Sequence, residues 1–253
     1  MKFGSFVAAA GVVLMLAQGQ GRAADIKVLS VLPLKTSLDE IGPQFERATG
    51  HKLTVVYHGS SQLKRAFEAG EAFDVALIYP ELIVELEKQG KLTPGTRANI
   101  ARVAIGVAVK KGTAKPDVST VDAFKRAMLD AKSISHSIEG ASGIYFKSLL
   151  ERLGIAAEVK SKLRPVEGGP LVVGPVARGE VEIAVITIPF IALEPGAELA
   201  GLLPNELQQI VVYTASIGSG SKQPDAAMAF VKSLTTPAAA AVIKSKGLDP
   251  AYP

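Results

Sequence analysis

The chain of 253 residues has no cysteine, no tryptophan and only three histidines. Without cysteine it can form no disulfide framework, offers no thiolate to a zinc ion and cannot carry a lipid on a cysteine. Nine phenylalanines and five tyrosines leave few aromatic faces, whereas proteins that stack nucleic-acid bases rely on such faces. These absences favour a diffusible protein over a lipoprotein and argue against a nucleic-acid partner.

An excess of charge of one sign is also missing. The chain has 28 basic and 24 acidic residues, which gives a formal net charge of +4. Residues 1–24 hold two of the basic residues and none of the acidic ones, so the remainder carries +2. The longest basic runs are pairs, such as Lys64-Arg65 and Lys110-Lys111. This balance gives no support to nucleic-acid binding and leaves a small anionic ligand open.

One apolar run stands out at the N-terminus. Met1-Lys2 supplies a positive charge, residues 6–17 are almost wholly apolar, and residues 18–24 are small or polar. Because about 20 apolar residues are needed to span a bilayer, this run predicts a cleavable signal peptide at residues 1–24 and not a membrane anchor. We therefore expect a mature protein that starts near Ala24 or Asp25 and works in the periplasm.

The rest of the chain alternates predicted strands and helices. Runs rich in β-branched residues predict strands at residues 26–31, 53–57, 74–78, 101–110, 133–138, 159–163, 182–187 and 209–214. Helical spacing of apolar residues predicts a first helix that ends at Gly50 and further helices at residues 62–69, 80–88, 121–130, 144–153, 170–178, 224–234 and 237–246. This alternation implies βαβ units and parallel sheets.

Two such series predict an α/β fold of two doubly wound lobes, with a ligand cleft between them and crossover strands that join them. We assign residues 25–106 and 213–253 to lobe 1 and residues 107–212 to lobe 2. With 48% hydrophobic and 21% charged residues, the chain can bury a substantial core. We predict a monomer.

Two serine-containing loops are the strongest candidates for a binding site. Gly59-Ser60-Ser61 and Gly140-Ala141-Ser142-Gly143 each follow a predicted strand and open a helix. Ligands of open α/β sheets bind at the carboxyl ends of strands, and helix N-termini present free N–H groups and a positive dipole end. Serine is also an ordinary N-cap. Two such loops at matching places nevertheless predict an anion site that includes Ser60, Ser61, Ser142 and Gly143.

Other candidates each have two interpretations. Lys35, in the first strand-to-helix loop, either pairs with an anion or is a solvated surface residue. His58 lies beside the first serine loop, where it either touches a ligand or faces solvent, whereas His136 falls in a predicted strand and suits a structural role. The turn Gly168-Gly169-Pro170 either brings backbone close to a ligand or simply begins a helix. Because the histidines show no metal-ligand spacing, we predict no metal and no cofactor.

Three blocks of sequence carry a resemblance to a known family. They are Gly59-Ser60-Ser61-Gln62-Leu63-Lys64-Arg65 with the following Glu68-Ala69-Gly70 and Ala72-Phe73-Asp74-Val75, then Gly143-Ile144-Tyr145-Phe146-Lys147 through Leu153-Gly154, and Gly179-Glu180-Val181-Glu182-Ile183-Ala184. In spacing and order they resemble the molybdate- and tungstate-binding family of periplasmic solute-binding proteins, which serve ABC transporters. The resemblance covers essentially the whole chain after residue 24.

The resemblance implies two lobes that close on a dehydrated oxyanion held by serine hydroxyls, backbone N–H groups and one tyrosine. The second family serine falls on Ser60, and the backbone donors fall on Ser142 and near Gly169. The first family serine falls on Pro33, which has neither a hydroxyl nor an N–H group. The family tyrosine falls on Thr187, whose hydroxyl sits on a shorter side chain.

These departures bear on the ligand. Each unfilled acceptor position of a buried oxyanion costs roughly 1–3 kcal/mol, and the smaller side chains enlarge the pocket. We therefore predict a ligand other than molybdate or tungstate, such as an organic carboxylate with Lys35 or His58 as a partner. Molybdate and tungstate remain the alternative ligands.

The resemblance implies a receptor that closes on a small anion and delivers it to the permease of an ABC transporter in the membrane. Such a protein is not an enzyme. Two alternatives stay open, namely a periplasmic sensor that docks a signalling receptor and an enzyme on the same scaffold. For an enzyme, His58 with Ser60 is the pair of side chains we can suggest, and no Gly-x-Ser-x-Gly elbow follows a strand.

Overall fold

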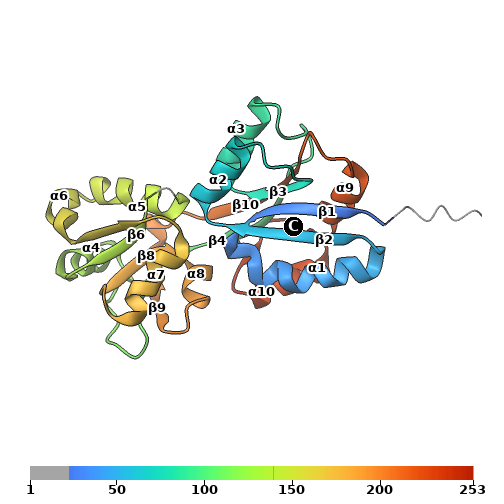
Figure 1. Cartoon of the computed structure of the whole chain (residues 1–253). Helices are drawn as coiled ribbons and strands as arrows, with labels where there is room; N and C mark the ends of the chain where they lie inside the picture. The colour runs from blue at the N-terminus through green and yellow to red at the C-terminus, as the bar shows by residue number, and fades with distance from the viewer. Residues whose placement is uncertain (1–22, 139, 253) are drawn as a thin grey trace, which may run out of the picture.

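The computed structural model describes residues 23–138 and 140–252, which form two lobes side by side (Figure 1). Most of the predicted signal peptide, residues 1–24, lies outside these residues. Ala24 is described and is only 4% exposed. Its N–H donates to His51 Nδ1 at 3.1 Å and its carbonyl accepts from the Lys52 N–H at 2.8 Å. Ala24 therefore belongs to the folded part of lobe 1, next to the start of β1.

Lobe 1 is built on a six-stranded sheet with the order β11-β4-β10-β3-β1-β2. Its strands are β1 (Asp25–Val31), β2 (Lys52–His58), β3 (Val75–Ile78), β4 (Ala98–Val103), β10 (Val211–Ile217) and β11 (Asp249–Pro250). Its helices are η1 (Leu32–Leu34), α1 (Lys35–Thr49), α2 (Ser60–Glu68), α3 (Pro80–Lys88), α9 (Pro224–Ser233) and α10 (Pro237–Ser245). Strands β1, β2 and β3 are parallel, whereas β10 runs antiparallel to both β3 and β4.

Lobe 2 is built on a five-stranded sheet with the order β7-β6-β8-β5-β9. Its strands are β5 (Ile105–Lys110), β6 (Ile134–Ser137), β7 (Leu163–Val166), β8 (Ile183–Thr187) and β9 (Ala197–Leu202). Its helices are α4 (Val121–Asp130), α5 (Ala141–Arg152), α6 (Ala156–Val159), η2 (Lys160–Lys162), α7 (Gly169–Arg178) and α8 (Ile188–Ala192), and η3 (Asn205–Leu207) follows β9. Strand β6 is parallel to β7 and β8, and β5 is antiparallel to β8 and β9.

The predicted α/β class with two lobes is confirmed, but each sheet is mixed and not wholly parallel. The predicted strand at 159–163 is wrong, because residues 156–162 form α6 and η2 and β7 begins only at Leu163. The physical reason is that Ile155 and Val159 are both buried at a helical spacing of four residues. Strand β9 was not predicted.

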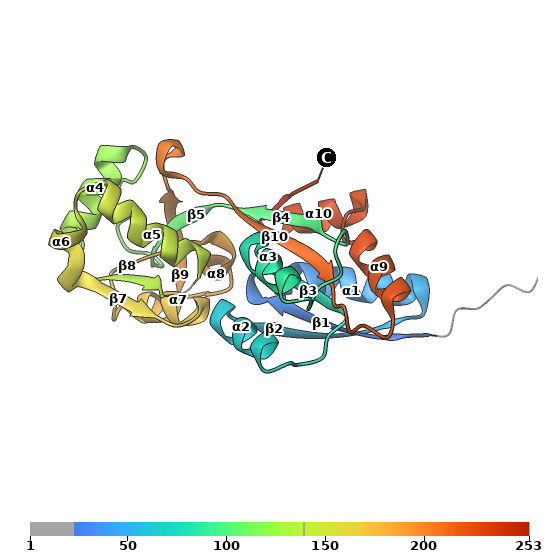
Figure 2. The ribbon, with the colours of Figure 1, turned by 90° about the horizontal axis from the view of Figure 1, so that it is seen from above.

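Two connections join the lobes. The predicted strand 101–110 is in fact β4 and β5, separated by Ala104, where the chain passes from one sheet to the other. It returns between β9 and β10, so the predicted boundaries at 106/107 and 212/213 fall inside β5 and β10. In Figure 2 these strands run across the space between the lobes. The Gln208 amide ties the connections together, since it accepts from the Ile105 N–H at 2.9 Å and donates to the Ile105 carbonyl at 3.0 Å.

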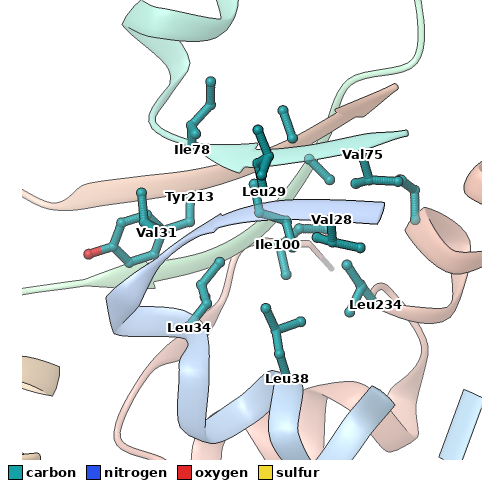
Figure 3. Close-up of a cluster of buried hydrophobic side chains, with 14 of the residues drawn as sticks. Val28, Leu29, Val31, Leu34, Leu38, Val75, Ile78, Ile100, Tyr213 and Leu234 are labelled. Carbon is teal, nitrogen blue, oxygen red and sulfur yellow. The ribbon is translucent and has the colours of Figure 1, made fainter. Parts of the chain in front are cut away.

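Each lobe has its own hydrophobic core. In lobe 1, β1 and β3 are covered on both faces, and Val28, Leu29 and Ile78 are fully buried between α1 and the other helices (Figure 3). Lobe 2 has one core around Phe124 and Phe146 and a second on the other face of its sheet, under α7. These cores fix the strand ends, from which the loops of the site extend.

Among residues 23–138 and 140–252, no single helix has the length and apolar character to cross a membrane. Helices α9 and α10 pass such a test only as a pair, by length and composition, and are bent by 61° at the break between them.

Candidate functional site

A cavity of about 40 Å³ lies between the two lobes. One water needs roughly 10–15 Å³ measured in this way, so the cavity has room for a small polyatomic group. Lobe 1 lines it with Val31, Pro33, His58, Gly59, Ser60, Ser61, Tyr79, Val211 and Tyr213, and lobe 2 with Ser137, Gly140, Ala141, Ser142, Gly168, Gly169, Ile186, Thr187 and Phe190. None of these described lining residues is Lys, Arg, Asp or Glu. We call this space the inner cavity.

Helices α2, α5 and α7 begin at the inner cavity, as do α3 and α8, whose N-caps Tyr79 and Thr187 line it. Gly59 caps α2, Gly140 caps α5, and α7 starts at Gly169. The first N–H groups of a helix have no acceptor within the helix and carry part of the positive end of its dipole. The cavity therefore receives N–H groups from both lobes, with the serine hydroxyls among them, and this combination suits an anion.

The structure brings most of the predicted site residues together. Pro33, His58, Ser60, Ser61, Ser142, Gly169 and Thr187 all line the inner cavity. Lys35 and Gly143 do not. That the lining residues contact a ligand stays a prediction.

Lys35 forms an ion pair with Asp39 of the same helix. Its Nζ lies 2.6 Å from the Asp39 carboxylate and 4.8 Å from the centre of the Tyr57 ring. Because Lys35 is the first residue of α1, Asp39 follows it one helical turn later, and an exposed ion pair at this spacing satisfies the lysine locally. The surface interpretation of Lys35 agrees with this position.

Gly143 shapes the site without lining it. A Cβ atom at this position would lie 1.8 Å from the Ser137 carbonyl oxygen. The missing side chain thus lets α5 pack against the end of β6. Ser137 completes the turn, since its Oγ accepts from the Gly140 N–H at 2.9 Å. Sequence analysis did not single out Ser137.

Tyr213 is the functional candidate that sequence analysis missed. It lies in β10 of lobe 1, is 4% exposed, and lines the inner cavity next to Thr187 of lobe 2. Burial raises the pKa of the Tyr213 phenol, and a hydrogen bond with the Thr187 side chain opposes this in part. The phenol therefore stays protonated and keeps its O–H. In Figure 3 its ring lies beside Val31, with the hydroxyl at the edge of the core.

The histidines have different surroundings. His58 is the last residue of β2 and lines the inner cavity. His136 is buried in β6, where its Nδ1 lies 3.0 Å from the Ser137 carbonyl and its ring packs against Phe146. A carbonyl can only accept, so Nδ1 carries the proton. In the described part of the chain, no group of three or more His, Asp or Glu side chains is placed to hold a metal.

The burial of His136 leads to a prediction about how stability depends on pH. Burial lowers its pKa, and the charge of Lys147 lowers it further. In the unfolded chain a histidine has a pKa of about 6.5, so near this pH the unfolded chain binds a proton more readily than the folded chain does. The free energy of unfolding therefore falls as the pH drops through that value. We expect the midpoint of thermal unfolding to decrease between pH 7.5 and 5.5, and His136→Gln to flatten this dependence. His51→Gln is the control, and an equal effect of both variants would contradict the assignment.

Residues 26–249 match the model of a protein family described as bacterial extracellular solute-binding protein. This chain belongs to that family. The inner cavity of this solute-binding protein thus lies where two lobes meet, and the predicted likeness to molybdate- and tungstate-binding proteins is confirmed by its relatives.

Two curated relatives and one solved structure are informative. The chain is 30% identical to a protein named aconitate isomerase from Pseudomonas sp, over 89% of this chain and 87% of that protein. It is 27% identical to the molybdate-binding protein ModA of Azotobacter vinelandii, over 92% of this chain and 96% of that protein. The solved periplasmic molybdate-binding protein of Azotobacter vinelandii superimposes with a TM-score of 0.73 at 20% identity, over 88% of this chain and 98% of that chain. That last likeness concerns the fold alone.

Proposed function

We propose that this protein captures a small carboxylate anion in the inner cavity, outside the cytoplasm, and delivers it to an ABC importer. The observation that carries the proposal is the lining of the cavity. Helix N-termini and hydroxyls from both lobes meet there, and none of the described lining residues is Lys, Arg, Asp or Glu. Such a set of neutral donors stabilises an anion without an ion pair.

A carboxylate suits the donors better than a tetrahedral oxyanion does. The hydroxyl of Tyr213 stands beside Thr187, so the tyrosine that the resemblance places at Thr187 is replaced from the other lobe. Pro33 also lines the cavity, and it still lacks both donors. A carboxylate has only two oxygens to satisfy. The relative named aconitate isomerase points to the same chemical class.

Thermal unfolding of the purified protein against a panel of anions tests the proposal. The panel holds molybdate, tungstate, sulfate, phosphate, butyrate, succinate and propane-1,2,3-tricarboxylate. Ligand at 1,000 times its Kd adds about 4 kcal/mol, which for a chain of this size raises the midpoint by about 10 °C. We expect this shift with a carboxylate. A comparable shift with molybdate or tungstate, and none with any carboxylate, would refute the proposal.

Pro33→Ser makes a separate prediction about ligand choice. The change returns an N–H group and a hydroxyl to the inner cavity, so binding of molybdate should tighten by about 5- to 150-fold for each bond of roughly 1–3 kcal/mol that is gained. Isothermal titration calorimetry with molybdate measures it. Pro224→Ser, at the exposed start of α9, is the matched control. Equal affinities in both variants would show that Pro33 does not limit oxyanion binding.

Isomerisation of an unsaturated tricarboxylate such as aconitate is a second candidate function. The favouring observations are the relative named aconitate isomerase and the position of His58 on the inner cavity. In such a reaction a base removes a proton from a methylene carbon, the double bond shifts, and the proton returns to the former vinyl carbon, so no further reactant is needed. An imidazole can perform both transfers.

Proton NMR of cis-aconitate in heavy water tests this second function. An isomerase would form the trans isomer and exchange methylene protons for deuterium, and His58→Asn would abolish both changes, whereas His51→Asn would not. If aconitate binds but neither isomerises nor exchanges, the protein is a receptor without this activity. The permease as partner stays a prediction, with a signalling receptor as its alternative. The monomeric state also stays a prediction.

A further inference from the structure

A second space of about 360 Å³ adjoins the inner cavity and is lined by residues of both lobes. We call it the outer chamber. It is lined by Leu32, Tyr57, Gly59, Ser61, Gln62, Arg65, Glu167, Gly168, Pro170 and Leu171. Three of these residues, Gly59, Ser61 and Gly168, also line the inner cavity. The two spaces therefore share a wall.

The shared wall is thin because it is made of glycine backbone. A Cβ atom on Gly59 would lie 3.5 Å from the Gly168 Cα, so the lobes approach here without intervening side chains. Gly59 precedes α2 of lobe 1, and Gly168 precedes α7 of lobe 2. In Figures 1 and 2 helix α2 faces lobe 2 at this boundary. A small separation of these two loops would join the inner cavity to the outer chamber.

The lining of the outer chamber includes a cationic side chain, which the described lining of the inner cavity does not. Arg65, in the last turn of α2, is the cationic side chain of its described lining. Its guanidinium lies 3.9 Å from the Glu167 carboxylate, beyond hydrogen-bond distance, and both side chains are more than half exposed, at 58% and 61%. The Tyr57 hydroxyl is already committed to Asp39 at 2.8 Å. Arg65 is thus placed to receive an anionic group from a ligand.

Apolar residues make up part of the lining of the outer chamber. Leu32 and Pro170 line the chamber, and Leu171 is 59% exposed there. Apolar surface together with one cation matches a ligand whose carboxylates are separated by a short hydrocarbon skeleton.

We propose that the outer chamber is a subsite for a second carboxylate, bound by Arg65, so that the ligand is a di- or tricarboxylate with one carboxylate in the inner cavity. This inference rests on the proposed function. Without ligand, the carboxylate of Glu167 balances the charge of Arg65. In the complex, a carboxylate of the ligand replaces Glu167 as the partner of Arg65.

A latch is the competing explanation of the same ion pair. Arg65 and Glu167 belong to different lobes, so their attraction also favours the closed arrangement. A latch acts only on the closure of the lobes. Replacing either Arg65 or Glu167 would then lower the affinity for every ligand by the same factor. A subsite makes the two residues act in opposite directions, and only on ligands with more than one carboxylate.

Calorimetric titration of the full protein with butyrate, succinate and propane-1,2,3-tricarboxylate separates the two. We expect Arg65→Gln to weaken succinate and the tricarboxylate by about 10- to 100-fold and butyrate by less than about twofold. Arg65→Lys should restore part of the loss, because a point charge replaces a bidentate donor. Glu167→Gln should tighten succinate a few-fold. Lys64→Gln, which removes a neighbouring charge paired with Glu85 at 3.9 Å, is the control.

The outcomes are distinguishable. If Arg65→Gln weakens butyrate as much as succinate, or if Glu167→Gln weakens succinate, the subsite is refuted in favour of a latch. If Arg65→Gln leaves succinate unchanged, the outer chamber is not used. The protein without substitutions is titrated first. If it binds no carboxylate at all, the proposed function itself fails, and the variants are not compared.

Discussion

Replacing Gly143 by alanine is expected to lower the midpoint of thermal unfolding by about 6–12 °C, because the clash costs about 3 kcal/mol. The new Cβ atom would lie 1.8 Å from the Ser137 carbonyl oxygen. A backbone oxygen cannot rotate away, so α5 or the end of β6 must move. Either movement displaces Ser142 and the turn that Ser137 holds, and ligand binding should be lost together with stability.

Thermal unfolding followed by circular dichroism measures this effect. Gly220→Ala is the matched control, since a Cβ atom there meets nothing within 4 Å and the residue lies outside the inner cavity. Gly169→Ala gives a useful comparison, because its Cβ would meet the Phe190 ring, a side chain that can turn, at 2.1 Å. Equal midpoints for the Gly143 and Gly220 variants would show that the close approach of α5 and β6 is not required.

Removing the Tyr213 hydroxyl is expected to cost ligand affinity more than stability. Tyr213→Phe deletes one donor from the inner cavity and leaves the Thr187 hydroxyl without its partner. A lost bond to a charged ligand costs roughly 1.5–3 kcal/mol, or about 10- to 150-fold in Kd. The aromatic ring stays in the core, so we expect the midpoint of unfolding without ligand to change by only a few degrees.

Titration with succinate measures the affinity of this variant. Tyr252→Phe is the control, since its hydroxyl donates to the Thr236 carbonyl at 3.1 Å on the exposed surface of lobe 1. An unchanged affinity in Tyr213→Phe would remove this hydroxyl from the site. A large loss of stability without ligand would instead assign it to the packing of the lobes.

Local signals made parts of the fold predictable. Helices 80–88 and 121–130 were predicted with the bounds that the structure shows, because Pro80 occupies the first turn of one and Thr120 caps the other. Gly50, with a φ of 75°, ends the first helix as predicted. The two serine loops were found for the same reason, since each lies directly between a strand and a helix.

Signals that depend on distant partners could not be recognised. The apolar run from Ala101 to Lys110 has no local feature that marks Ala104 as the point where the chain changes sheets. Tyr213 belongs to the site only because β10 returns beside the end of β8, and no spacing in the sequence shows that. The pairing of Lys35 with Asp39, by contrast, has a local i, i+4 spacing, which our sequence analysis did not consider.

The lining of the inner cavity also bears on how fast a ligand is captured. Long-range attraction speeds association between opposite charges, and salt screens it over about 10 Å at 0.1 M. Residues 25–253 carry only +2, and Arg65 in the outer chamber is balanced by Glu167. For the anionic ligand that we propose, we therefore expect little long-range electrostatic steering from the net charge. We expect its association rate with that ligand to change little between dilute and saline solution.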